Sequence, residues 1–360
     1  MPALEPSSAS SSLRLAVLIV SWNGRADLEA CLASLAADLA HPFPIDIFLV
    51  DNHSSDDSLA FVREKYPAVR ITALSRNTGF AGGNNAGLEQ ILAENYTYAV
   101  LLNQDTVVTP GWLEALVETA TQFPAAGAVQ PLILLYKQPQ IINTSGNPFH
   151  FFGFGYSGQV GENRDKAPGS AAAVAIPSAS GACVLLRVSA LRIVGLFDEL
   201  FFSYNEDLDL SWRLRLAGYD ILLAPQVVIY HNYDFKRYSS RKLYLVERNR
   251  LMLILKNYAP GTLLLISPML FLFEIYMLLY AWKEGWLGLK LEAYREVWHN
   301  LPHIRAWRRK VSAFRRVSDR TMAGWMTPRL ENDFHKSFLV RAGNFFLTLY
   351  WAVTRRMILW

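Results

Sequence analysis

The sequence LAVLIVSWN at residues 15–23, followed by IDIFLVDN at residues 45–52, decides the fold class. In each stretch a mostly apolar run ends in polar residues, which is typical of a buried strand that leads into a polar loop. A helical pattern with Leu28, Leu32 and Leu35 on one face separates the two runs. Strand, helix and strand in this order predict a βαβ unit and a parallel sheet.

The same alternation continues to residue 131. Further strands are expected at Val69–Leu74 and Tyr98–Leu102, and further helices at 57–65 and 83–94. We therefore predict an α/β fold with a mostly parallel central sheet. Ligands of such sheets bind beyond the carboxyl ends of the strands. The site is expected at the polar strand ends Ser21-Trp22-Asn23, Asp51-Asn52, Ser75-Arg76-Asn77 and Asn103-Gln104-Asp105.

The middle of the chain opens with a long segment at 137–177 that is rich in Gly, Pro, Ser and Asn and carries an aromatic run at 150–156. A loop of this length is usually a lid, a binding loop or a disordered segment. We favour a loop that lines the binding site of an acceptor substrate. Regular structure is expected to resume at Cys183–Arg187, with helices ending near Val194 and Ala217, two short strands before His231, and a helix near 241–256.

The C-terminal part differs in composition from the rest of the chain. Hydrophobic residues make up 52% of the 360 residues and charged residues 18%, and the most apolar stretch, Leu263–Trp282, is long enough to span a bilayer. Residues 283–360 hold 15 Lys+Arg against 6 Asp+Glu, whereas residues 1–282 hold 20 against 25. A basic segment directly after an apolar one favours an anionic membrane surface over nucleic acid as a partner.

A single membrane span would place this basic segment on the far side, against the positive-inside rule. We expect instead a helix in the plane of the interface, or a re-entrant pair, with Phe338–Trp351 as the second apolar element. The alternative is a helical subdomain packed on the catalytic domain. The basic residues expected to face lipid phosphates are Arg308, Arg309, Lys310, Arg315 and Arg316.

The two cysteines, Cys31 and Cys183, form no metal-binding motif, which argues against structural zinc and a disulfide framework and favours a reducing compartment. Residues 1–12 are rich in Ser and Ala and lack the pattern of a signal peptide, so a disordered tail is expected there. The N-terminal half is therefore expected in the cytoplasm.

The string NTGFAGGNNAG at residues 77–87 lies between an expected strand and an expected helix. Its glycines would allow close backbone approach, and free amides at a helix start favour an anion. The spacing differs from the dinucleotide motif G-x-G-x-x-G, which argues against an NAD site. A tight connection without a ligand is the other interpretation.

Asp105 follows a hydrophobic strand, and His231 follows a later one. A divalent cation that bridges two phosphates needs only one or two carboxylate oxygens from the protein, so Asp105 could be a metal ligand or could cap the region after Pro110. His231 could ligate the metal, contact phosphate or be structural.

Glu206, Asp207 and Asp209 begin an expected helix, where the dipole favours acids. The aromatic stretch at 201–205 before them suits a pocket floor, so Glu206 or Asp207 could act as a general base. The alternative is that these acids cap the helix, with Asp209 paired to Arg213 four residues later.

Together these strings resemble the inverting family 2 glycosyltransferases, and within them the rhamnosyltransferase-like branch. The motifs occur in family order over about residues 14–250. They are VSWNG at 20–24, VDNHSSD at 50–56, the string at 77–87, LNQD at 102–105, SGAC at 180–183, FDE at 197–199 and EDLD at 206–209.

The resemblance implies a GT-A-type fold, a nucleotide-diphosphate sugar donor and a Mg2+ or Mn2+ ion. It implies donor binding by six residues: Ser21, Asn23 and Asp51 at the nucleoside, and Asn77, Gly79 and Asn103 along the donor pocket. It implies Asp105 and His231 at the metal, Asp207 as the catalytic base and Glu206 beside it. Asn103 stands where the family often has an acid, so metal affinity is expected to depend on the donor phosphates.

We predict an inverting glycosyltransferase that moves rhamnose from dTDP-rhamnose to a glycan or polyprenyl-linked acceptor in cell-surface polysaccharide synthesis. It would lie peripherally or monotopically on the cytoplasmic face of the inner membrane. The predicted organisation is a tail at 1–12, a GT-A-type domain at 13–256 and a helical, apolar and basic membrane-associating region at 257–360. A non-catalytic nucleotide-binding regulator on a degenerate transferase fold and a nicotinamide-dependent enzyme are the alternatives. The sequence does not predict an oligomeric state.

Overall fold

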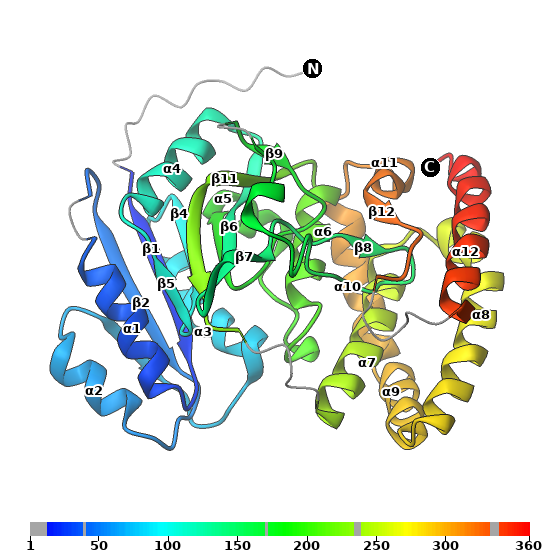
Figure 1. Cartoon of the computed structure of the whole chain (residues 1–360), viewed down its shortest axis with the longest axis horizontal. Helices are drawn as coiled ribbons and strands as arrows, with labels where there is room; N and C mark the ends of the chain where they lie inside the picture. Colours follow the sequence, from blue (N-terminus) through cyan, green and yellow to red (C-terminus); the bar gives the residue numbers. More distant parts are fainter. Residues whose placement is uncertain (1–12, 39–40, 170–171, 234–238, 332–337) are drawn as a thin grey trace.

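The computed structural model describes residues 13–38, 41–169, 172–233, 239–331 and 338–360, so the expected tail at 1–12 lies outside the described residues. The N-terminal half is the predicted series of βαβ units (Figure 1). Its four strands are parallel and lie in the order β3-β2-β1-β4. The elements are β1 (Leu15–Ser21), α1 (Arg25–Ala36), β2 (Ile45–Asp51), α2 (Ser58–Lys65), β3 (Arg70–Ala73), α3 (Gly79–Ala93) and β4 (Tyr98–Asn103).

The second half of the sheet mixes parallel and antiparallel pairs. β10 is antiparallel to β4 and β6, β11 is parallel to β6, and β5 is antiparallel to β11. The two short strands expected before His231 are one strand, β11, with a register shift between Ala224 and Val228. The elements are β5 (Thr106–Val108), α4 (Trp112–Gln122), β6 (Ala126–Leu135), β10 (Cys183–Arg187), α5 (Val188–Val194), α6 (Glu206–Leu216) and β11 (Asp220–His231).

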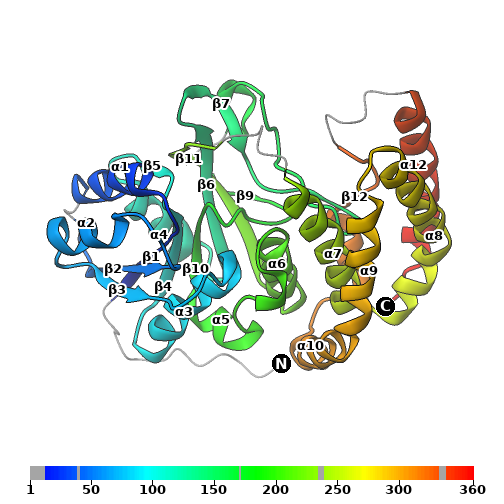
Figure 2. The ribbon, with the colours of Figure 1, turned by 90° about the horizontal axis from the view of Figure 1, so that it is seen from below.

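Helices cover both faces of the sheet and bury two separate cores (Figure 2). On one face α1 and α4 pack on the strands through side chains such as Leu28 and Leu116. On the other face α3, α5 and α6 contribute Leu88, Leu191 and Leu214. This three-layer arrangement leaves the strand ends free to carry the site.

The helix expected at 83–94 begins earlier, within the string at 77–87. Helix α3 begins at Gly79, so most of the glycines lie inside it. A Cβ on Gly87 would lie 2.3 Å from Leu18 Cδ1, and one on Gly83 would lie 2.7 Å from Val20 Cγ1. These two glycines therefore let α3 pack closely on β1, which is the structural alternative for this motif.

The segment at 137–177 is largely built into the fold. β7 (Gln138–Thr144) extends β6 as an antiparallel hairpin, and β8 (Phe149–His150) pairs with β12 (Met326–Thr327). Phe151 and Phe152 are fully buried, and the Phe151 ring stacks on Trp351 with 4.6 Å between centroids. The start of the aromatic run is therefore core and not part of a loop, and the run then passes beside α6, where Asn205 donates to the Gly153 carbonyl at 3.2 Å. The shorter elements of this segment are η1 (Arg164–Lys166) and β9 (Val174–Ala175), and η2 (Glu199–Phe201) follows later, before α6.

The C-terminal region is helical and packs on the α/β part through one large core. Its two apolar segments, α8 and α12, lie side by side at the end of the molecule, as Figure 1 shows. α8 is one continuous helix despite Pro268. The elements are α7 (Ser240–Asn257), α8 (Pro260–Lys283), α9 (Leu287–His299), α10 (Leu301–Phe314), α11 (Asp319–Met322), η3 (Ala323–Trp325) and α12 (Phe338–Met357).

Two of the five basic residues expected at lipid phosphates are directed inward instead. Arg308 donates a hydrogen bond to the Leu255 carbonyl, and Arg315 pairs with Asp319 and donates to the Asn257 carbonyl. Both guanidinium groups satisfy carbonyls at the end of α7, where helix hydrogen bonding stops. The prediction is therefore wrong for Arg308 and Arg315, which hold helices together.

Candidate functional site

The predicted strand ends meet at one edge of the sheet. Ser21 is the register partner of Asp51 across β1 and β2, and Val20 is the partner of Asn103 across β1 and β4. Ser21 and Asp51 are buried, and within the described part of the chain the Ser21 hydroxyl has no hydrogen-bond partner. Since buried polar groups are normally paired, this hydroxyl is available to a bound ligand.

Hydrogen bonds between the loops form a rim around this edge. The Asn23 side-chain oxygen accepts from the Ser55 amide at 2.7 Å, and the Asp51 carboxylate accepts from the Ser54 amide at 3.3 Å. Gln104, to which the sequence analysis assigned no role, accepts from the Trp22 amide at 2.9 Å. These hydrogen bonds join the loops after β1, β2 and β4. The Asn23 side-chain oxygen is therefore used within the rim, where it accepts from the Ser55 amide.

Asn52 is a second residue that the sequence analysis left without a role. Its side-chain NH2 donates to the Gly79 carbonyl at 2.9 Å, and its oxygen accepts from the Thr78 amide at 2.8 Å. The Asn77 oxygen accepts from the Gly79 amide at 2.8 Å. Asn52 therefore places Asn77 and Gly79 beside the tip of β2. Its position directly after Asp51 in the quoted motif was the available signal.

The two predicted metal ligands also lie together. His231 ends β11, and its Nε2 atom is 3.1 Å from Asp105 Oδ1. Its Nδ1 atom is 2.9 Å from the side-chain oxygen of Asn143 on β7. A proton on Nδ1 would donate to Asn143 and leave Nε2 with a lone pair for a cation. The Asp105 side chain is 29% exposed, so this oxygen and nitrogen fit as ligands of a divalent cation at an open edge.

The acid pair at the start of α6 lies close to the tip of β4. The Asn103 amide donates to the Ala182 carbonyl at 2.9 Å, and the adjacent Gly181 amide donates to Asp207 Oδ2 at 3.1 Å. The segment Ser180–Cys183 is one of the quoted motifs, and here it connects Asp207 to the strand that precedes Asp105. The structure therefore brings the predicted base and the predicted metal ligand to the same sheet edge.

Glu206 and Asp207 have different surroundings. Glu206 is buried, and among the described residues its Oε2 atom has no hydrogen-bond partner. Burial and the negative charge of Asp207 raise the pKa of Glu206 well above its usual value. Asp207 is half-buried, and burial raises its pKa too, but the amides of Gly181 and Leu208 donate to its carboxylate and oppose that rise. The pKa of Glu206 is therefore raised by two effects, whereas two amide hydrogen bonds favour the ionised form of Asp207.

The chain before this pair adopts unusual backbone conformations. Phe202, Tyr204 and Asn205 all have positive φ angles, 63°, 71° and 66°. The Phe202 carbonyl accepts a hydrogen bond from the Ala81 amide at 3.1 Å, and a Cβ on Gly79 would lie 2.3 Å from that carbonyl oxygen. Left-handed conformations of bulky residues persist only where the surroundings fix them, and they concentrate at functional sites.

This geometry can be compared with known proteins. A family model described as "Glycosyltransferase like family 2" matches residues 13–252. The chain belongs to glycosyltransferase family 2. It is 30% identical over 242 residues to an N-acetylglucosaminyl-diphospho-decaprenol L-rhamnosyltransferase of Mycobacterium tuberculosis, over 61% of this chain and 76% of that relative. It is 24% identical over 246 residues to a low-salt glycan biosynthesis hexosyltransferase of Haloferax volcanii, over 66% of this chain and 74% of that relative.

Among solved structures, GalNAc-T7 with UDP, GalNAc and Mn2+ matches this chain with a TM-score of 0.57. The identity is 16%, and the match covers 68% of this chain but 48% of the GalNAc-T7 chain, so the likeness shows the fold alone. The α/β part of this glycosyltransferase therefore has the expected GT-A-like fold.

The third acid of the EDLD motif has a structural role in this glycosyltransferase. Asp209 is fully buried and bonds to Arg213 Nε at 2.9 Å, Lys256 Nζ at 2.9 Å and the Asn257 side chain at 2.8 Å. Lys256 also bonds to Asp198 at 2.9 Å. The alternative interpretation of this motif is confirmed for the Asp209–Arg213 pair within α6. The bonds of Asp209 to Lys256 and Asn257 fix α6 on α7.

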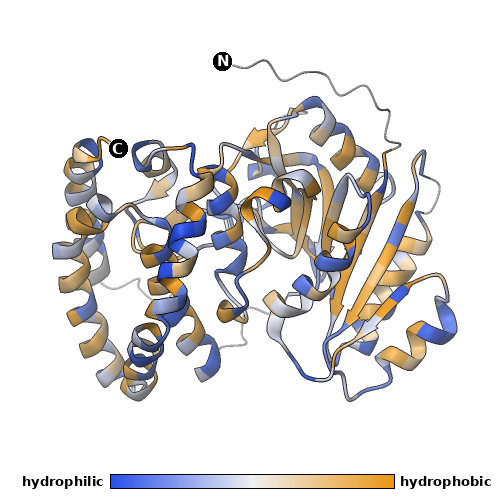
Figure 3. Ribbon diagram, turned by 180° about the vertical axis from the view of Figure 1, so that it is seen from behind, coloured by the Kyte–Doolittle hydropathy of each residue, from blue (hydrophilic) through white to orange (hydrophobic). Residues whose placement is uncertain are grey.

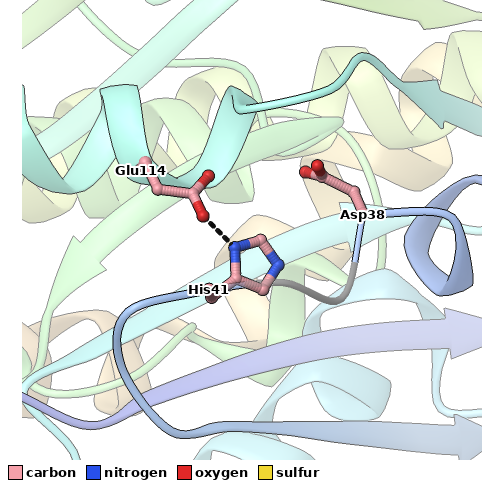
Figure 4. A group of neighbouring side chains, drawn as sticks. All are labelled: Asp38, His41 and Glu114. Atoms are coloured by element: carbon pink, nitrogen blue, oxygen red, sulfur yellow. Dashed lines mark hydrogen bonds and ion pairs between the residues drawn. The ribbon is translucent and has the colours of Figure 1, made fainter.

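A further cluster of metal-ligating residues, Asp38, His41 and Glu114, is shown in Figure 4. The ring of His41 pairs with Glu114, and Asp38 accepts a hydrogen bond from the Gly111 amide at 3.1 Å. These residues join the end of α1 and the chain before β2 to the start of α4, away from the strand tips. Each side chain thus has a protein partner, and the cluster connects elements of the fold.

Proposed function

We propose that this glycosyltransferase transfers a sugar with inversion from a nucleotide-diphosphate donor, with Asp207 as the catalytic base. The observation that carries the proposal is the pair at the start of α6. The Gly181 and Leu208 amides donate to the Asp207 carboxylate, and beside it lies Glu206, whose Oε2 atom has no hydrogen-bond partner among the described residues. A base must be within reach of the acceptor hydroxyl and able to take its proton, and Asp207 is half-exposed with amide hydrogen bonds that favour its ionised form.

In the proposed reaction the acceptor hydroxyl attacks the anomeric carbon from the side opposite the diphosphate. Asp207 accepts the hydroxyl proton while the new glycosidic bond forms and the bond to the diphosphate oxygen breaks. The diphosphate then leaves with the bonding electrons. One displacement of this kind inverts the anomeric configuration and needs only one base.

Asp105 and His231 are the residues that would hold Mg2+ or Mn2+, which when bound supplies positive charge beside the departing diphosphate. Their contact at 3.1 Å supports this role, and Asn143 keeps the histidine ring oriented. Asn103, at the tip of β4, lies close to Asp105 in the chain, but its amide side chain carries no charge. Metal affinity is therefore expected to rise when the donor diphosphate is present.

The donor is proposed to lie along the strand tips, with the nucleoside at Ser21, Asn23 and Asp51. The unpaired Ser21 hydroxyl supports this placement. Asn77 and Gly79 then line the pocket beside Asn103. Rhamnose from dTDP-rhamnose is the proposed donor, because the 30% identical Mycobacterium relative is named an L-rhamnosyltransferase.

A polyprenyl-linked acceptor is proposed on the same ground, since that relative's name contains a diphospho-decaprenol. The product would belong to cell-surface polysaccharide synthesis. Because polyprenyl carriers reside in a membrane, the enzyme would act on the cytoplasmic face of the inner membrane. One helix, α8, is long and apolar enough to cross a bilayer by length and composition.

The test begins with thermal unfolding in the presence of nucleotide sugars, with and without Mn2+, because a ligand that binds the folded state raises its Tm. We expect dTDP-rhamnose with Mn2+ to give the largest rise. Transfer to a synthetic GlcNAc-diphospho-polyprenol is then followed by product formation, and the product is expected to have the inverted configuration. Donor-induced stabilisation without transfer to any acceptor would instead favour a nucleotide-binding regulator.

A further inference from the structure

The outer faces of α8 and α12 are almost entirely apolar. Side chains on these faces are highly exposed, up to 73% for Leu264, 71% for Trp282 and 67% for Phe345. On α8 they recur every three or four residues, so they form one continuous stripe. Figure 3 shows apolar segments along both helices at this end of the molecule. The other members are Phe271, Leu272, Ile275 and Leu279 on α8, and Phe346, Leu349, Val353 and Met357 on α12.

The two stripes form one surface, which we call the α8–α12 face. A groove of about 500 Å3 lies between the helices and is lined by Leu265 and Met269 of α8 and by Phe346, Leu349 and Val353 of α12. The Tyr350 hydroxyl of α12 donates to the Leu265 carbonyl of α8 and so links the two helices beside the groove. A contiguous apolar surface of this extent on a folded chain marks an interaction site.

The opposite side of α8 is fixed to the protein along its whole length. Ile266, Phe273, Met277 and Ala281 are buried on this side. The acid of the helix, Glu274, also points inward, where its carboxylate bonds to Arg250 of α7 at 2.7 Å and to Lys290 of α9 at 2.8 Å. The direction of α8 is therefore set by the helices beneath it.

Exposed cations flank the α8–α12 face. Lys283 ends α8, Arg341 lies near the start of α12, and Arg355 and Arg356 lie in its last turn. Their positions at the ends of apolar helices are those at which long basic side chains reach lipid phosphates. Arg309, Lys310 and Arg316 are exposed too, but they lie on or just after α10, which packs mainly on α5, α6, α7 and α9.

We propose that the α8–α12 face docks on an anionic lipid bilayer with both helices in the plane of the membrane. The exposed side chains enter the hydrocarbon boundary, the groove takes lipid chain segments, and the flanking cations contact phosphates. The alternative, α8 as a span, would draw α9 into the hydrocarbon together with its exposed Glu292 and Arg295, at high cost. The docking does not depend on sugar transfer, so its failure is distinguishable from failure of the proposed function.

The first experiment is flotation of the full chain with vesicles of pure phosphatidylcholine and with vesicles that also contain phosphatidylglycerol. We expect tighter binding to the anionic vesicles and weaker binding at high salt. The double variant Leu279→Asp/Phe346→Asp should bind at least tenfold more weakly. The control Ile193→Asp changes an equally apolar side chain, 45% exposed on α5, and should bind like the wild type. Equal binding by both variants, or none by the wild type, would overturn the proposal.

The second experiment separates the in-plane from the spanning arrangement. Both native cysteines are buried, so the variants Leu264→Cys, Leu272→Cys and Leu279→Cys carry single reactive thiols for a fluorophore. Residues 264 and 279 lie about 22 Å apart along the helix axis. Depth-dependent quenching by brominated lipids should place all three labels at one shallow depth. A depth for Leu272→Cys at the bilayer centre, with the two ends near opposite surfaces, would contradict the in-plane arrangement.

Discussion

Buried and half-buried carboxylates lie together in two regions of this glycosyltransferase, and their partners differ. At the start of α6, Glu206 and Asp207 have no cationic partner within the part of the chain that the structure describes, and burial raises the pKa of both. Between α7, α8 and α9, Glu247 and Glu274 share Arg250 and Lys290 at hydrogen-bond distance. Although burial alone would raise it, these two cations lower the pKa of Glu274 to about 2.

The difference indicates what each group of acids does. A buried carboxylate with a cationic partner stays ionised and is held in place, so it contributes to structure. A carboxylate without one has a raised pKa and is therefore a stronger proton acceptor when ionised, which is the property that a catalytic base needs. Burial alone does not separate the two, since Glu206 and Glu247 are both buried.

The largest effect is expected from Asp207→Asn. The variant keeps the size of the side chain but cannot accept a proton, so we expect kcat to fall by about a thousandfold or more. Donor affinity should stay within a few-fold of the wild type, because Asp207 is placed on the acceptor side. Initial rates of transfer and calorimetric titration with the donor check both points. Full turnover by this variant would remove Asp207 as the base.

The paired acids are tested by Glu274→Ala. The change leaves Arg250 and Lys290 buried with one carboxylate between them, and we expect a loss of about 3 to 5 kcal/mol in the free energy of unfolding. Urea unfolding measures it. Glu292→Ala, which removes an exposed acid 3.8 Å from an exposed Arg295, should change stability by less than about 1 kcal/mol. Equal losses of unfolding free energy in the two variants would mean that the buried cluster stabilises the fold no more than an exposed ion pair does.

The same cluster predicts a pH dependence. Because the folded-state pKa of Glu274 is lowered to about 2, its stabilising contribution is present above the ordinary glutamate value of about 4.3. It is lost as the pH falls from there toward 2. The wild type should therefore lose more stability than Glu274→Ala over this acidic range, and unfolding series at several pH values would detect the difference.

Asp105→Ala is expected to have a smaller effect. We expect donor affinity in the presence of Mn2+ to fall by about tenfold or more, because one ligand of the cation is lost. Without metal the wild type and the variant should bind the donor equally. The two titrations differ only in the metal, so unchanged affinity in both would exclude Asp105 as a ligand.

Glu206→Gln should have the smallest effect on transfer. Burial and the charge of Asp207 raise the pKa of Glu206, so we expect a neutral amide to replace it with little change and kcat to stay within a few-fold. Its raised pKa means that the folded state holds a proton that the unfolded state releases, so this residue costs stability as the pH rises above about 4.3. The variant should be more stable than the wild type at pH 8, as its Tm would show. A lower Tm would contradict this assignment.

The sheet and the strand tips could be predicted from the sequence because their signals are local. Apolar runs with polar ends mark β1, β2 and β4, and parallel pairing then brings Ser21, Asp51 and Asn103 to one edge. The helix from Glu206 was also predicted, since acids and a following Gly218 mark its two ends.

What could not be predicted depends on contacts between distant segments. The aromatic run near Phe151 reads as a loop until Trp351, two hundred residues later, is placed against it. Arg315 reads as a surface cation until its pairing with Asp319 and the Asn257 carbonyl is known. Asn143 lies in a segment that looked irregular, so its contact with His231 left no signal in the sequence.

Infrared difference spectroscopy at neutral pH measures most directly where the proton of the acid pair lies. A protonated buried carboxyl gives a C=O stretching band that an ionised carboxylate lacks. We predict that this band is present in the wild type, persists in Asp207→Asn and disappears in Glu206→Gln. A band that disappears in Asp207→Asn and persists in Glu206→Gln would place the proton on Asp207 and contradict its assignment as the ionised base.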